Sequence, residues 1–235
     1  RDLVCALRSA ERLGLAEGVC NHFSLAVPAQ PGRFLVNPQG LHWSEVTPAD
    51  LVVVDRDGRH VSGKHAVEPT AFFIHGCIHR ANPRAQCVLH THMPYATALT
   101  IIDNAELAWA SQNALRFHGR VAYDRGYTGL ALNDTEGERM AAKLGAADVL
   151  FLANHGVIVC GPGVAYAFDD LYYLERACML QVLAGATGKP LKIVTQKIAA
   201  QTRAQMDAER GQSELHLAAL KRILDRERPG WSKLK

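Results

Sequence analysis

The chain has 235 residues, 48% hydrophobic side chains and a formal net charge of +3. This length and apolar content suit one large domain with a sizeable core. Acidic and basic residues are mixed along the chain without a basic arm or stripe, so we expect no nucleic-acid partner.

Two further features concern the compartment. The longest apolar runs, such as 149–153, are far shorter than the roughly 20 residues of a membrane span, and no signal peptide is visible at the start, so we expect no membrane association. The six cysteines sit singly in apolar stretches, which is typical of buried free thiols and predicts a cytoplasmic protein.

The first third of the chain predicts one helix and several short strands. Apolar positions at helical spacing indicate a helix over Leu3–Leu15, with Gly18 as a stop signal. Strand-like segments, separated by turn residues at 37–40 and Asp57-Gly58, follow at 23–27, 34–36, 51–55 and 60–62.

Helices and strands then mix. Helical patterns cover 70–81, 94–99, 133–144 and 164–183, and strand patterns cover 87–90, 149–153 and 157–160. The stretch 103–117 is ambiguous. A charged, mostly helical tail runs to residue 228 after a joint at Pro190. Without a strict βαβ rhythm or a nucleotide-binding glycine motif, we expect a single layered domain over 1–235, of either α+β or α/β/α type, with the helical tail from about residue 190.

Three of the eleven histidines indicate a metal site. His90 and His92 end a buried apolar strand, where residues two apart point to the same face. His155 lies in a turn directly after a second apolar strand, so neighbouring strands would bring all three imidazoles to one rim. Three neutral nitrogen ligands suit Zn, Mn, Fe, Co or Ni and leave positions for substrate. The same spacing also occurs in ordinary pairs of strand histidines.

The segment from His75 to His92 resembles the class II aldolase/adducin family, in which a histidine-bearing helix precedes an apolar strand ending His-x-His. Further matching segments are Asn21-x-x-Ser24, Asn37-Pro-Gln-Gly40, Tyr127-Thr-Gly129 and Asn154-His155-Gly156. The resemblance implies an α/β/α three-layer sandwich around a mixed, largely antiparallel sheet. It also implies a homotetramer with active sites at subunit interfaces, and one divalent metal per subunit, with zinc expected first and manganese, iron or cobalt as alternatives.

The chain departs from the family's aldolases at their acid/base residue. The glutamate that those enzymes place four residues before the helix histidine is Ala71 here, and Glu68 lies three residues earlier. The serines of the sugar-phosphate members are replaced by Gln39, Pro69 and Thr70, so a carboxylate or phenolic substrate fits as well as a phosphate.

The resemblance and the retained histidines together predict a divalent-metal-dependent carbon–carbon lyase, either an aldolase or a decarboxylase. It would act on a small hydroxylated carbonyl compound or carboxylic acid through a metal-stabilised enediolate or enolate. A non-haem iron oxygenase and a non-catalytic adducin-like binding module are the alternatives.

The predicted site residues form two groups. Those expected to bind substrate are Asn21, Ser24, Gln39, Gly40 and Thr70. Those expected to act as acid or base are Tyr127, Tyr123, His118 and Glu136, each of which could instead be an ordinary packing or surface residue. His75 is expected to support the site from its helix rather than to bind metal.

Overall fold

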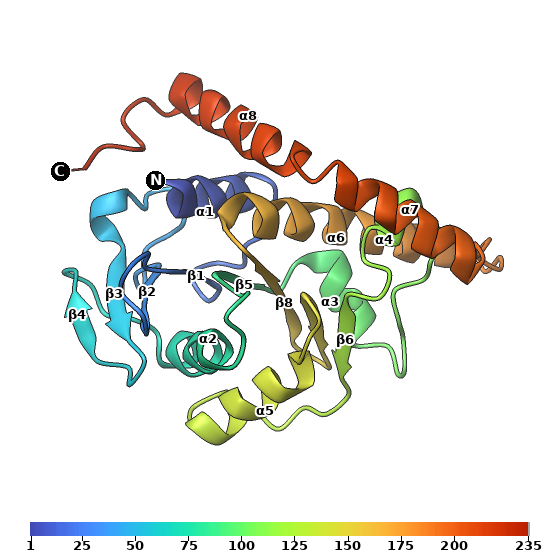
Figure 1. Cartoon of the computed structure of the whole chain (residues 1–235), viewed down its shortest axis with the longest axis horizontal. Coiled ribbons are helices and arrows are strands. Elements are labelled where there is room, and N and C mark those ends of the chain that lie inside the picture. Colours follow the sequence, from blue (N-terminus) through green and yellow to red (C-terminus); the bar gives the residue numbers. More distant parts are fainter. Residues whose placement is uncertain (235) are drawn as a thin grey trace.

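An eight-stranded sheet forms the middle layer of the molecule, as seen in a computed structural model that describes residues 1–234 (Figure 1). Its strand order is β4-β3-β2-β1-β5-β8-β7-β6. All neighbours are antiparallel except β6 and β7. The strands are β1 (His22–Ala26), β2 (Arg33–Val36), β3 (Val52–Asp55), β4 (His60–Ser62), β5 (Cys87–Thr91), β6 (Val121–Asp124), β7 (Val149–Leu152) and β8 (Gly156–Gly161).

Helices cover both faces of this sheet (Figure 1). One layer contains α2 and α5, and the other contains α1 and α6 with α8 lying over them. The helices are α1 (Asp2–Arg12), α2 (Pro69–Ala81), α3 (Pro94–Thr100), α4 (Gln112–Leu115), α5 (Asp134–Leu144), α6 (Val164–Gly185), α7 (Gln196–Ala208) and α8 (Gln212–Glu227), with a 3-10 turn η1 (Pro48–Asp50). The expected α/β/α sandwich with a mixed, largely antiparallel sheet is therefore confirmed.

Successive side chains of the central strands point to opposite faces of the sheet, so the core is divided into two clusters. In β5, Leu89 packs into the cluster that contains α1 and α6, whereas Val88 packs into the cluster that contains α2 and α5. Their antiparallel partners on β8, Val159 and Cys160, follow the same division. Because successive strand residues point to opposite faces, both faces of β5 and β8 are fully covered. The open ends of these strands are therefore where polar side chains can gather.

The structure also resolves the stretches that the sequence left open. The ambiguous segment 103–117 contains only the one-turn helix α4, and the edge strand β6, which we did not predict, follows it. The first three residues of β6 are only partly buried, so the strand carries little alternation of the kind that sequence patterns detect. Within residues 1–234, no helix is both long and apolar enough to cross a membrane.

Candidate metal centre

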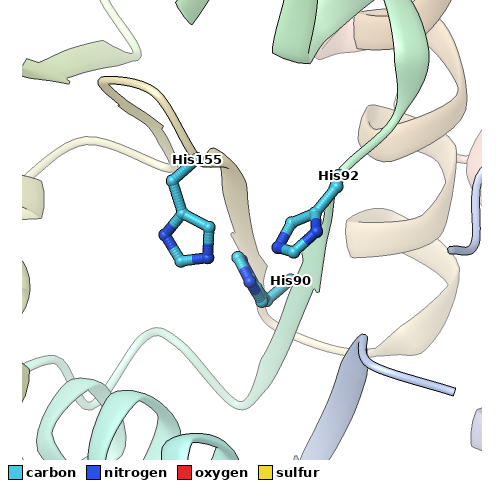
Figure 2. A group of neighbouring side chains, drawn as sticks. All are labelled: His90, His92 and His155. Atoms are coloured by element: carbon cyan, nitrogen blue, oxygen red, sulfur yellow. The ribbon is translucent and has the colours of Figure 1, made fainter. Parts of the chain in front are cut away.

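The three predicted metal ligands converge at one end of the central strands (Figure 2). His90 lies near the end of β5, His92 follows the strand's last residue, and His155 lies in the turn between β7 and β8. Antiparallel pairing of β5 with β8, with Thr91 opposite Val157, brings the two segments together. The ring centroids lie 4.8 to 5.1 Å apart, and one candidate ligand nitrogen from each residue lies within 4.8 Å of the others.

Hydrogen bonds at the far side of two rings orient them toward the cluster. His90 donates from Nδ1 to the carbonyl oxygen of Val157 at 3.0 Å. His92 donates from Nδ1 to a carboxylate oxygen of Glu17 at 2.5 Å. Each Nδ1 is therefore the protonated nitrogen, and each Nε2 lone pair is free to bind a metal ion.

The chemistry of the cluster fits a divalent metal. Nε2 of His92 is buried and has no hydrogen-bond partner among the described residues, which a metal ion would supply. Burial lowers the pKa of His90 well below its ordinary value and that of His155 to about 4. Both imidazoles are therefore neutral at pH 7, as metal ligation requires. Three nitrogen donors leave one or more positions for a substrate oxygen.

The residue that follows His155 must be glycine, because this turn lies close against the end of β5. A Cβ atom added at Gly156 would lie 2.5 Å from the carbonyl oxygen of Thr91 and 2.8 Å from Cδ2 of His92. Asn154 before it adopts a left-handed backbone conformation with φ of 58°. The Asn-His-Gly sequence is thus what allows the turn to approach the end of β5 closely.

A buried chain of side chains supports the cluster from behind. His22, opposite His90 in the β1–β5 pairing, packs its ring 4.8 Å from the His90 ring. Its Nδ1 lies 2.9 Å from Nε2 of His75, and Nδ1 of His75 lies 2.6 Å from the hydroxyl of Ser24. That hydroxyl lies 2.8 Å from Nε2 of His79, whose Nδ1 donates to the carbonyl of Ala85. His75 therefore contacts the side chains of His22 and Ser24, and its supporting role stays a prediction.

The predicted substrate-binding residues occupy different environments. Asn21 is buried, and its amide nitrogen has no partner among the described residues, so it has a donor free for a ligand. Thr70 is partly buried and its hydroxyl lies 3.3 Å from Nε2 of His22. Gln39 and Gly40 are exposed in their turn, where Gly40 has a positive φ of 79°. Ser24 is fully buried within the histidine chain.

The predicted acid/base residues are also dispersed. Tyr127 is 54% exposed, whereas the hydroxyl of Tyr123 accepts the backbone N–H of Leu107. Nε2 of His118 lies 2.6 Å from the side-chain oxygen of Gln196 in α7. Glu136 forms an ion pair with Arg139, which holds its pKa below the ordinary value, and its charge partly offsets the lowering of the His155 pKa by burial. Of these four residues, Glu136 is the one whose charge acts on a predicted metal ligand.

Three residues near the site were not predicted to take part in it. They are Glu17, His22 and Glu68. Glu68 is the N-cap of α2, and its carboxylate lies 3.4 Å from Nε2 of His22. Ala71 instead packs in an apolar cluster with Phe34 and Val36. For His22, the only signal in the sequence was its position next to Asn21, a predicted substrate-binding residue. Its pairing with His90 could not be predicted, because local spacing does not show which strand residue lies opposite His90.

Comparisons with known proteins identify relatives of this chain. The model of the family described as Class II Aldolase and Adducin N-terminal domain matches residues 1–182. The decarboxylase NovR of Streptomyces niveus is 34% identical over 94% of this chain and 83% of its own length. A Streptomyces roseochromogenus protein named 4-hydroxy-3-prenylphenylpyruvate oxygenase/4-hydroxy-3-prenylbenzoate synthase is 35% identical over 78% of this chain and 66% of its own.

A solved structure supports the same assignment. The L-fuculose 1-phosphate aldolase from Glaciozyma antarctica superposes with a TM-score of 0.85 at 27% identity, over 98% of this chain and 90% of that one. The match thus extends across the sheet, both helical layers and most of the tail. The chain belongs to the class II aldolase and adducin family.

Proposed function

We propose that the protein is a metal-dependent carbon–carbon lyase, with one divalent metal held by His90, His92 and His155. The observation that carries this proposal is the convergence of three imidazoles, one of which, that of His92, has a buried, unpartnered Nε2. Relatives named as a decarboxylase and as an aldolase support the reaction class. Zinc is the expected metal, because it is readily held by three imidazoles with one position left open.

The bound metal and the side chain of Asn21 would have separate roles in the reaction. A bound divalent metal supplies Lewis acidity at a substrate oxygen, which stabilises the negative charge formed when a carbon–carbon bond breaks. Asn21 would donate its free amide N–H groups to a second substrate oxygen. It is held in place because its own oxygen accepts the N–H of Glu17, the residue that orients His92. The substrate would therefore be a small molecule with two neighbouring oxygens.

Proton transfer needs a separate group, and two of the predicted residues remain candidates. Glu136 lies in the first turn of α5, close enough to His155 for its charge to partly offset the lowering of the His155 pKa by burial. Tyr127 is exposed on the same segment as Leu130 and Leu132, which are also exposed. Such a surface suits the subunit interface of a homotetramer, where Tyr127 would serve a neighbouring site. We keep Tyr127 as a candidate for that reason.

A second candidate function is a non-haem iron oxygenase. One specific observation favours it: the relative that is 35% identical carries oxygenase in its name. Three histidines with open positions could hold iron as well as zinc. The metal that copurifies with the protein separates the two functions, together with oxygen consumption and the release of carbon dioxide or aldehyde from hydroxy acids and aromatic acids.

Metal analysis with one ligand variant tests the proposal. Protein purified without added metal should contain close to one zinc per subunit, and His155→Ala should lose most of it. His60→Ala is the matched control, because His60 is exposed on the edge strand β4. Unchanged occupancy in His155→Ala, or a wild-type protein that takes up no metal when supplied with it, would refute the site. Near-stoichiometric iron with oxygen consumption would favour the oxygenase.

A further inference from the structure

The start of α2 lies one imidazole away from the candidate metal centre. The hydroxyl of Thr70 is 3.3 Å from Nε2 of His22, and the His22 ring is 4.8 Å from the His90 ring. The first backbone N–H groups of a helix have no partner within the helix and carry partial positive charge, so they commonly bind anionic groups such as phosphate. A substrate that extends from the metal toward α2 would meet this position.

In this chain, a carboxylate of the protein already occupies that position. Oε2 of Glu68 accepts the backbone N–H of Ala71 at 3.3 Å and also accepts the Thr70 hydroxyl. The same oxygen lies 3.4 Å from Nε2 of His22. The donors that a helix start would offer to a bound phosphate are therefore engaged by Glu68.

The charge of Glu68 is not offset by a permanent cation. Its one ion-pair partner in residues 1–234 is His22, and no lysine or arginine pairs with it there. About a third of the Glu68 side chain remains exposed, with a relative accessibility of 30%. The carboxylate therefore presents negative charge and free acceptor lone pairs to whatever binds beside it.

We propose that Glu68 determines the substrate class of this site. It excludes substrates that carry a phosphate at the end remote from the metal, and it accepts a hydrogen bond from a neutral hydroxyl, phenol or amine there. A second anion would lie within a few ångströms of the carboxylate and would have to displace it from its donors. This inference rests on the proposed function, because it assumes that substrate binds at the metal and reaches toward α2.

Phosphate binding tests the inference without knowledge of the true substrate. Glu68→Ser removes the carboxylate but keeps a side chain that caps helices well, so the start of α2 should persist. Inorganic phosphate is titrated into the zinc-loaded wild type and Glu68→Ser, with binding followed by ³¹P NMR at low ionic strength. We expect Glu68→Ser to bind phosphate at least about tenfold more tightly, the effect of removing one nearby like charge in a partly solvated site.

Two further proteins and one further measurement make the outcome decisive. Glu138→Gln, which removes an exposed carboxylate of α5, should bind phosphate as the wild type does. Adding Thr70→Val to Glu68→Ser should abolish the gain, whereas phosphate held by zinc alone would be unaffected. Equal phosphate affinity in wild type and Glu68→Ser, or a gain that survives Thr70→Val, would overturn the inference. Zinc content measured on the same samples tests the proposed function separately, since a wild type without zinc contradicts the metal centre and not the role of Glu68.

Discussion

Glu17 should control how tightly the proposed centre holds its metal, although it is not itself a ligand. Its carboxylate accepts the Nδ1 hydrogen of His92 at 2.5 Å, which fixes the ring and increases the electron density at Nε2. Glu17→Gln keeps an oxygen acceptor of the same length but removes the negative charge. The substitution therefore tests the electrostatic support of the ligand rather than its position.

The expected size of the effect follows from the exposure of the pair. Loss of a group that hydrogen-bonds a metal ligand typically weakens metal binding by about 10- to 100-fold. The Glu17 side chain is 64% exposed, so solvent already screens much of its charge, and we expect the lower end of the range. Zinc affinity should fall by about tenfold, equivalent to about 1.4 kcal/mol.

Competition with a chromophoric chelator measures this change in zinc affinity directly. Glu138→Gln serves as the control for loss of one negative charge elsewhere on the surface. Thermal unfolding of the metal-free proteins checks that neither substitution disturbs the fold. An affinity for Glu17→Gln within twofold of the wild type, or an equal loss in Glu138→Gln, would show that this reasoning is wrong.

Two further predictions concern stability. Ala71→Glu should lower the free energy of unfolding by about 3 kcal/mol or more without raising activity, because position 71 is 1% exposed in an apolar cluster; a change under about 1 kcal/mol in urea denaturation would contradict this. Burial lowers the pKa of His79 to about 4, whereas the ordinary value of a histidine is near 6.5. Between these two pH values, His79 therefore binds a proton in the unfolded chain but not in the folded protein. As the pH is lowered from about 6.5 to about 4, the free energy of unfolding should therefore decrease, by up to about 1.4 kcal/mol per pH unit from this residue. The slope from urea denaturation should be smaller in His79→Gln.

The residues of the site that could be predicted from sequence are those whose geometry is local. His90 and His92 lie two residues apart at a strand end, so their shared direction follows from strand geometry alone. His155 lies in the turn of the β7–β8 hairpin, and its approach to the others follows once β8 pairs with β5. The three-layer fold was likewise predictable, because it rests on the joint pattern of family segments.

The supporting residues were not predictable because they depend on register between distant segments. His22 reaches His90 only through the pairing of β1 with β5, and no local pattern sets that register. Glu17 lies in an irregular segment after α1, where its side chain extends to the end of β5. The docking of the tail has the same origin, since Arg210 pairs with the buried Asp170 of α6.

At the start of α2, this chain has alanine at position 71, where the aldolases have glutamate, and a glutamate at position 68 instead. This difference explains why the chain can keep its predicted metal ligands and yet lack the aldolase glutamate. Position 71 faces the apolar cluster below β2 and β3, where a carboxylate would be costly to bury. Position 68 precedes the helix, where its carboxylate is stabilised by the Ala71 N–H and the helix dipole while it remains partly exposed. In this chain the negative charge is therefore found at position 68, where it is bonded to the helix start. On the proposed role of Glu68, a substrate would reach the proposed metal without an anion of its own at that end, and the change would lie in the choice of substrate rather than in the metal chemistry.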